Sequence, residues 1–222
     1  MDAGHVLVDG ELKVGGDLVL LAHGAGADMN HEFMAAMAKG LAAKGMCVVR
    51  FNFPYMQKCA GDGKRRPPDR APNLLACFEH YLDLAVNAGA ARIYLMGKSM
   101  GSRMAAIMVA DDLVAGKVAG VVCLGYPFMP VARKKEVGGE TEPRLEPLQQ
   151  AKVPVLVLQG ERDSFGSFAR ASIWPLGTNT SIKPIPDGDH SFVPRKSSGT
   201  TLVANLTLAV DYCVAFFGEK HA

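Results

Sequence analysis

The sequence predicts an α/β protein: a three-layer sandwich in which a mostly parallel central sheet lies between two layers of helices. Three observations predict this class. Short apolar runs rich in strand-forming residues alternate with segments whose apolar residues recur at helical spacing. Several runs are apolar throughout, which is typical of strands buried within a parallel sheet. The 222 residues contain no internal repeat and no linker, so we expect one domain over residues 1–222.

The apolar runs place the elements along the whole chain. Strands are expected at 6–8, 18–22, 46–51, 93–97, 118–124, 153–159 and 182–185. Helices are expected near 30–44, 74–88, 102–115, 167–173 and 198–217, with Asn30 capping the first and Ser197 or Ser198 the last. Residues 56–72 are predicted to form a polar loop. Residues 126–150, with four prolines and a Gly-Gly pair, are predicted to leave the sheet and could form a short lid.

The composition excludes several classes of protein. Hydrophobic residues make up 49% of the chain, charged residues 21%, and the formal net charge is +2, which predicts a soluble globular protein. The densest basic cluster, at 64–66, is followed by two prolines and has no interleaved aromatic residues, so no nucleic-acid partner is expected. The N-terminus resembles no secretory signal, and no apolar run is long enough to cross a membrane.

The cysteines indicate a reducing compartment. None of the five forms a CxxC pair, and Cys47 and Cys123 fall inside apolar runs, as buried thiols do. We therefore expect a cytoplasmic protein without a disulfide framework. The chain also lacks an HExxH pair, a P-loop lysine motif and a GxGxxG sequence after a strand, so no metal and no organic cofactor are expected.

Residues 97–101, Gly-Lys-Ser-Met-Gly, stand where a strand ends and a helix begins. A serine at such a sharp turn adopts a strained backbone that exposes its hydroxyl, and flanking glycines prevent collisions with the neighbouring strand and helix. Ser99 is therefore the predicted nucleophile. The alternative is a glycine-flanked helix cap in an ordinary α/β protein.

Asp163 and His190 complete a predicted catalytic triad. Both follow late strands, and loops after parallel strands meet at one edge of the sheet. A serine hydroxyl needs a base to remove its proton, a neutral imidazole suits that task, and a carboxylate fixes the imidazole tautomer. Asp187 and Asp189 compete with Asp163 for this role, but they lie too close to His190 in sequence for their side chains to reach its ring easily.

The loop after the second strand is predicted to stabilise an oxyanion. Residues 23–27, His-Gly-Ala-Gly-Ala, carry small side chains that let main-chain N–H groups approach a ligand. We expect one donor from Met100 and the second from Ala25, with Gly24 and Gly26 able to contact substrate. The alternative is a simple strand-to-helix turn. His23 is expected to shape this loop rather than to act as a base.

Arg65 and Arg66 lie on a loop at the same edge of the sheet. They could bind an acidic group of the substrate through bidentate hydrogen bonds, or they could be solvated or paired with Asp62 and Asp69. Lys98, beside the nucleophile, is expected to be structural, although it could change the electrostatics of the site.

These motifs together resemble the α/β-hydrolase superfamily over essentially the whole chain. More narrowly, residues 21–27, 49–55, 64–68 and 97–101 resemble the small predicted hydrolases grouped near dienelactone hydrolase, which also resemble a domain of a chromatin-complex subunit. The resemblance implies an α/β-hydrolase fold and a triad at Ser99, Asp163 and His190. Dienelactone hydrolases use a cysteine nucleophile, and this chain has a serine there.

The leading functional hypothesis is a serine hydrolase that cleaves a small ester or thioester, its small-molecule acyl substrate, through an acyl-enzyme. A small peptidase or amidase uses the same residues and is a second hypothesis. The third is a binding or scaffold protein that keeps the fold without turnover, a role suggested by the chromatin-associated relative. A complete triad favours the enzyme. The sequence indicates neither the acyl group nor the oligomeric state.

Overall fold

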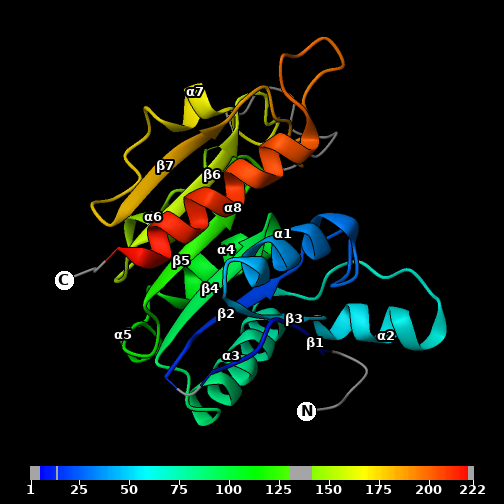
Figure 1. The fold of residues 1–222 in the computed structure, drawn as a ribbon, viewed down its shortest axis with the longest axis vertical. Coiled ribbons are helices and arrows are strands. Elements are labelled where there is room, and N and C mark those ends of the chain that lie inside the picture. The colour runs from blue at the N-terminus through cyan, green and yellow to red at the C-terminus, as the bar shows by residue number, and fades with distance from the viewer. Residues whose placement is uncertain (1–5, 14, 131–141, 220–222) are drawn as a thin grey trace.

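The computed structural model describes residues 6–13, 15–130 and 142–219, and its seven strands form one sheet in the order β1-β3-β2-β4-β5-β6-β7 (Figure 1). Only β1 is antiparallel to its neighbour, β3, and every other pair is parallel. The strands are β1 Val6–Asp9, β2 Asp17–Ala22, β3 Cys47–Phe51, β4 Arg92–Lys98, β5 Gly120–Leu124, β6 Val155–Gly160 and β7 Thr180–Ile185. The predicted three-layer α/β class is confirmed.

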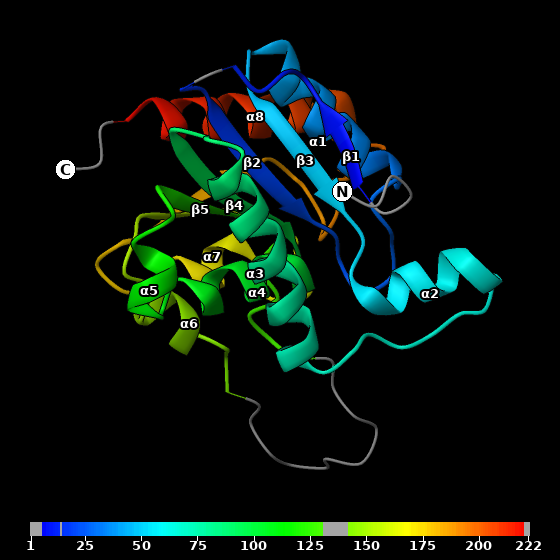
Figure 2. The ribbon, with the colours of Figure 1, turned by 90° about the horizontal axis from the view of Figure 1, so that it is seen from below.

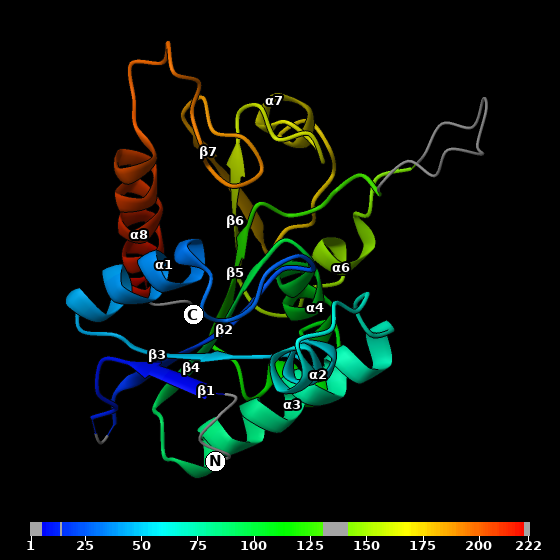
Figure 3. The ribbon, with the colours of Figure 1, turned by 90° about the vertical axis from the view of Figure 1, so that its right-hand side faces the viewer.

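Helices cover both faces of the sheet. Helices α1 and α8 lie on one face, and α3, α4 and α6 lie on the other (Figures 2 and 3). The helices are α1 Glu32–Ala43, α2 Pro54–Asp62, α3 Ala71–Asn87, α4 Met100–Met108, α5 Asp112–Ala115, α6 Glu146–Gln149, α7 Phe168–Ala171 and α8 Leu202–Gly218. Among the described residues, every helix is too short or too polar to span a lipid bilayer.

The alternation of side chains along each central strand divides the core into two halves. Along β2, Leu18, Leu20 and Ala22 pack on the side of α3 and α4, whereas Val19 and Leu21 pack on the side of α1 and α8. Successive side chains of a strand point to opposite faces, so a strand covered by helices on both faces must be apolar throughout. This is why the central strands appear in the sequence as uninterrupted apolar runs.

Residues 56–72 were predicted to form a loop, and this prediction is wrong at both ends, because α3 begins at Ala71 and residues 56–62 belong to α2. Pro54 occupies the first turn, where its missing N–H is not needed, and Gly63 ends the helix in the left-handed conformation at φ 70°. Tyr55 is buried and fixes the helix to the core. Few apolar residues follow Tyr55, so periodicity did not reveal this helix.

Three helix boundaries also differ from the prediction. The helix after Ser99 ends at Met108, and a separate helix, α5, begins beyond Asp111, whose carboxylate accepts a hydrogen bond from the N–H of Leu113. His31 rather than Asn30 caps α1, and Thr201 rather than Ser197 or Ser198 caps α8. Each of these segments contains several residues able to cap, and tertiary packing selects among them.

Of the predicted excursion at 126–150, residues 131–141 lie outside the described residues. The described residues on either side of this segment contribute buried side chains to the core. Tyr126 and Phe128 are fully buried, and Leu148 of α6 is buried in the same half of the core.

Candidate active site

Ser99 lies at a sharp turn between β4 and α4. Its backbone adopts φ 52° and ψ −111°, a conformation that a residue with a side chain adopts only when its surroundings impose it. The N–H of Ser99 donates to the carbonyl of Leu124 at 3.0 Å, and its carbonyl accepts from the hydroxyl of Ser102 at 2.6 Å. The strained turn predicted at this serine is confirmed.

The two flanking glycines are required by close packing. A Cβ on Gly97 would lie 2.2 Å from the carbonyl carbon of Gly101, and a Cβ on Gly101 would lie 2.5 Å from the carbonyl oxygen of Ala22. These atoms belong to the backbone and cannot move aside. The turn therefore excludes any side chain at either position, as the sequence predicted.

Three side chains from distant segments meet at the carboxyl edge of the sheet. Nε2 of His190 lies 2.8 Å from the hydroxyl of Ser99, and Nδ1 of the same ring lies 2.8 Å from Oδ2 of Asp163. Ser99 follows β4, Asp163 follows β6, and His190 follows β7. The structure thus brings together all three residues that the sequence singled out.

The Asp163 carboxylate is buried and hydrogen-bonded on both oxygens. The N–H of Phe165 donates to Oδ1 at 2.8 Å, and Nε2 of Gln159 donates to Oδ2 at 3.0 Å. The Phe165 ring also lies against the imidazole of His190, with centroids 4.4 Å apart. These contacts fix the carboxylate so that one oxygen faces Nδ1–H of the ring.

Asp187 and Asp189, the alternatives to Asp163 as partner of His190, bond to other groups. Asp187 forms an ion pair with Arg195, and the carboxylate of Asp189 accepts from the N–H groups of Ser191 and Val193. Both side chains stabilise the turn that carries His190. Geometry therefore selects Asp163 as the partner of the ring.

His23 shapes the loop after β2, as expected. Its fully buried ring lies 2.8 Å through Nδ1 from the carbonyl of Gly24, and Nε2 accepts from the N–H of Phe53 at 3.0 Å. These partners fix the tautomer with the proton on Nδ1. Burial lowers the pKa of His23 below its usual 6.5, so the ring stays neutral.

The two N–H groups predicted to bind an oxyanion are unoccupied. Within the described residues, the N–H groups of Met100 and Ala25 donate no hydrogen bond. Gly24 lies close to the nucleophile, because a Cβ added there would be 3.5 Å from Cβ of Ser99. The loop therefore borders the hydroxyl.

Comparison with known proteins identifies the family of the chain. A family model described as "Alpha/beta hydrolase domain" matches residues 16–218. The chain belongs to the alpha/beta hydrolase family. The predicted superfamily is thus confirmed, and the family supports hydrolase activity.

Solved structures share the fold of this α/β hydrolase at low sequence identity. Est1E from Butyrivibrio proteoclasticus is 14% identical, with a TM-score of 0.70 over 96% of this chain and 94% of that one. A serine hydrolase without lid from Xanthomonas campestris is 18% identical, with a TM-score of 0.64 over 98% and 90%. Dienelactone hydrolase from Anabaena variabilis is 17% identical, with a TM-score of 0.63 over 90% and 87%.

Lys98 is a buried cation behind the nucleophile. Its Nζ donates to the carbonyl of His190 at 2.5 Å and lies 5.5 Å from the centre of the Phe33 ring. Burial lowers the pKa of Lys98 to about 8, and the carboxylates of Asp163 and Asp189 partly oppose this shift. The lysine thus connects the strand that carries the nucleophile to the backbone of the residue predicted as the base.

The two arginines predicted to contact substrate differ in their surroundings. Arg66 forms a bidentate ion pair with Asp62, at 2.7 and 2.5 Å, whereas Arg65 has no such partner within the described residues. Both line an open cleft of about 520 Å³, and Ala25 and Gly26 also line it. The pairing of Arg66 with Asp62 is one of the alternatives that the sequence left open.

Sequence reasoning did not identify Gln159 as part of the site. Its buried side-chain amide accepts from the N–H of Tyr126 at 2.9 Å and donates to Asp163 and to the carbonyl of Gly166. The signal was present, because Gln159 is a polar residue inside an otherwise apolar strand, and a buried amide requires hydrogen-bond partners.

Among the described residues, no three metal-ligating side chains lie close enough together to hold a metal ion.

Proposed function

We propose that this α/β hydrolase is a serine hydrolase that cleaves a small ester or thioester through an acyl-enzyme. The observation that carries the proposal is the continuous series of hydrogen-bond distances, each 2.8 Å, from Ser99 through His190 to Asp163. His190 takes the hydroxyl proton as Ser99 attacks the acyl carbon, and Asp163 stabilises the imidazolium that forms. His190 then returns the proton to the leaving group.

The attack places negative charge on the former carbonyl oxygen. The N–H groups of Met100 and Ala25 are the proposed donors to this oxygen, and donors of this kind contribute about 3 kcal/mol each to the transition state. Water then enters, His190 activates it, and hydrolysis of the acyl-enzyme regenerates Ser99.

A scaffold without turnover is less well supported. Such a protein has no chemical need for a half-exposed serine within hydrogen-bond distance of an imidazole. The same residues would serve a small peptidase or amidase, and experiment must identify the leaving group.

All five cysteines are free thiols, which supports the proposal of a reducing, cytoplasmic location.

Labelling with a fluorophosphonate probe tests the proposal. We expect the wild type to be labelled and Ser99→Ala to remain unlabelled at the same thermal stability. Ser102→Ala is a matched control, because Ser102 lies one turn beyond Ser99 with its hydroxyl bonded to the Ser99 carbonyl. Equal labelling of the wild type and Ser99→Ala, or no labelling of either, would contradict the proposal. A panel of ester, thioester and amide substrates then identifies the leaving group.

A further inference from the structure

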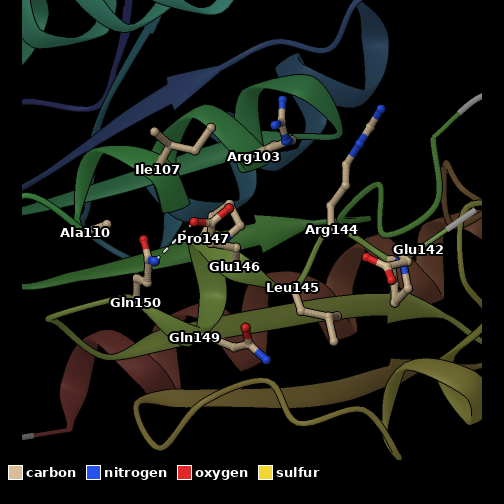
Figure 4. Close-up of a pocket in the computed structure, with 11 residues that line it drawn as sticks. Arg103, Ile107, Ala110, Glu142, Arg144, Leu145, Glu146, Pro147, Gln149 and Gln150 are labelled. Carbon is tan, nitrogen blue, oxygen red and sulfur yellow. Dashed lines mark hydrogen bonds between the residues drawn. The ribbon is translucent and has the colours of Figure 1, made fainter.

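Two arginine side chains share a cleft between α4 and α6. The cleft has a volume of about 760 Å³ and is lined by α4, by the segment before α6, and by α6 itself. In Figure 4 one side of the cleft runs from Arg103 through Ile107 of α4 to Ala110 beyond its end, and the guanidinium groups of Arg103 and Arg144 both lie at the Arg103 end. Helix α4 begins at Met100, so this is the end of the cleft nearer Ser99.

Neither guanidinium is neutralised. Within the described residues, no carboxylate lies within 4.0 Å of Arg103 or Arg144, and Nε of Arg103 is buried without a hydrogen-bond partner. Glu142 and Glu146 also line the cleft, but neither pairs with an arginine, and Glu146 accepts from Gln150 at 3.2 Å. A buried N–H of a charged group that lacks an acceptor destabilises the protein unless a ligand supplies one.

The surrounding structure holds the two cations in place. The N–H of Arg103 donates to the carbonyl of Ser99 at 3.1 Å, and the buried Tyr126 donates its hydroxyl to the carbonyl of Arg144 at 3.1 Å. Burial first, and the positive charge of Arg103 second, lower the pKa of Arg144. Figure 4 shows both guanidinium groups at the same end of the cleft, so an anion bound there would offset the two positive charges.

The Arg103 end of the cleft is the part of its lining that lies nearest to Ser99 along α4. Side chains on a helix lean toward its N-terminus, so Arg103 covers the first turn of α4, which begins directly after Ser99. The other basic cleft, beside Ala25, is less suited to an anion. Its Arg66 is already paired with Asp62, so only Arg65 and Lys64 of its basic side chains lack such a partner among the described residues.

We propose that Arg103 and Arg144 form a subsite for an anionic group, carboxylate or phosphate, carried by the substrate whose acyl carbon Ser99 attacks. This inference rests on the proposed function and specifies its substrate class. Both groups present oxygens that accept paired hydrogen bonds from a guanidinium, so the chemistry that recognises them is shared.

Three 4-nitrophenyl esters of matched acyl length test the subsite: the neutral pentanoate, the anionic hemiglutarate and the 4-phosphonobutanoate. We expect the wild type to prefer one or both anionic esters by about tenfold or more in kcat/KM, the effect of a charge-assisted hydrogen bond. Arg103→Gln and Arg144→Gln should each abolish this preference, mainly by raising KM for the anionic esters more than KM for the pentanoate. The ester whose preference is lost identifies the anion as carboxylate or phosphate.

Two further arginines serve as controls. Arg92→Gln makes the same substitution at the opposite end of β4, where the guanidinium is paired with Asp17 at 2.9 Å, and should leave the preference unchanged. Arg65→Gln tests the other cleft. If the preference for anionic esters disappears in Arg65→Gln and persists in Arg144→Gln, the anion binds beside Ala25 and the proposed subsite is wrong.

A binding measurement separates failure of the subsite from failure of the catalytic proposal. Calorimetry measures the affinity of Ser99→Ala for the same three esters, which this variant should not hydrolyse. We expect an anionic ester to bind about tenfold more tightly than the pentanoate, and the added Arg144→Gln substitution to remove the difference. Equal affinities would overturn the subsite even if the wild type hydrolyses all three esters. If the affinity for an anionic ester depends on Arg144 but the wild type hydrolyses none of the three esters, the subsite is supported and the proposed hydrolase activity is refuted.

Discussion

His23 and His190 both lie in loops at the carboxyl edge of the sheet, yet their surroundings differ completely. His23 is fully buried, and its two ring nitrogens face the backbone at Gly24 and Phe53. The side chain of His190 is 21% exposed, and its nitrogens face two side chains, those of Asp163 and Ser99. A ring tied to backbone groups can only hold a loop, whereas a ring between a carboxylate and a hydroxyl can move a proton.

Removing His190 should give the largest loss of activity and little loss of stability. In His190→Ala no base accepts the Ser99 proton, so we expect kcat to fall by about 10⁴-fold or more. Because the ring is partly exposed, the melting temperature should stay close to that of the wild type. Ester hydrolysis and thermal unfolding measure the two effects. Activity within tenfold of the wild type would remove His190 from the mechanism.

Replacing Asp163 by asparagine sharpens the same comparison. The amide can no longer stabilise an imidazolium, and its NH₂ group can favour the wrong tautomer of His190, so we expect kcat to fall by about 10³- to 10⁴-fold. The N–H of Phe165 can still donate to the amide oxygen of the new side chain in place of Oδ1, so the fold should persist. Asp189→Asn is a matched control on the loop that carries His190, and its kcat should exceed that of Asp163→Asn by at least tenfold. Equal losses in the two variants would contradict the assigned role.

His23 should show the opposite balance between activity and stability. In His23→Leu the buried N–H of Phe53 loses its acceptor, so we expect a loss of about 1–3 kcal/mol in the free energy of unfolding. Activity should fall by less than the roughly 10²-fold that loss of an oxyanion donor costs, because the loop loosens but remains. Chemical denaturation and ester hydrolysis test both values. A variant as stable as the wild type would show that the ring does not hold the loop.

The pKa of His23 adds a dependence on pH with a defined sign. Burial lowers this pKa below 6.5, so the unfolded chain binds a proton that the folded chain does not as the pH falls through 6.5. The stability of the wild type relative to His23→Gln should therefore decrease from pH 7 to pH 5. Denaturation curves for both proteins at several pH values measure this difference. A constant difference would show that the ring is not held neutral.

Lys98 should give the smallest effect on activity and a pH dependence of its own. Its pKa of about 8 lies below the usual 10.5, so between pH 8 and 10.5 the unfolded chain binds more protons than the folded one. The stability of the wild type relative to Lys98→Met should therefore rise with pH across this window. Because Lys98 donates to the backbone carbonyl of His190 and not to its ring, kcat should change less than in His190→Ala. If the stability difference between the wild type and Lys98→Met stays constant from pH 7 to pH 10, Lys98 is not a buried cation with a lowered pKa.

Much of the fold was readable from local patterns. The central strands are mostly apolar because helices cover both faces, so the runs at 18–22, 46–51 and 118–124 could be recognised as strands. The α2 helix was missed because its residues are polar on the whole and it packs chiefly through Tyr55. Helix caps were misplaced by one to four residues, because neighbouring side chains of similar capping strength are distinguished only by packing.

By itself, the sequence determined the turn at Ser99 and the order of Ser99, Asp163 and His190, because a glycine-flanked serine between strand and helix is a local pattern. Only the tertiary structure decided that Asp163 rather than Asp187 meets His190, and that Arg66 pairs with Asp62 while no described carboxylate pairs with Arg103 or Arg144. Pairing of charges and hydrogen bonds depends on distances across the fold. Those distances are set by how strands and helices far apart in the chain pack together.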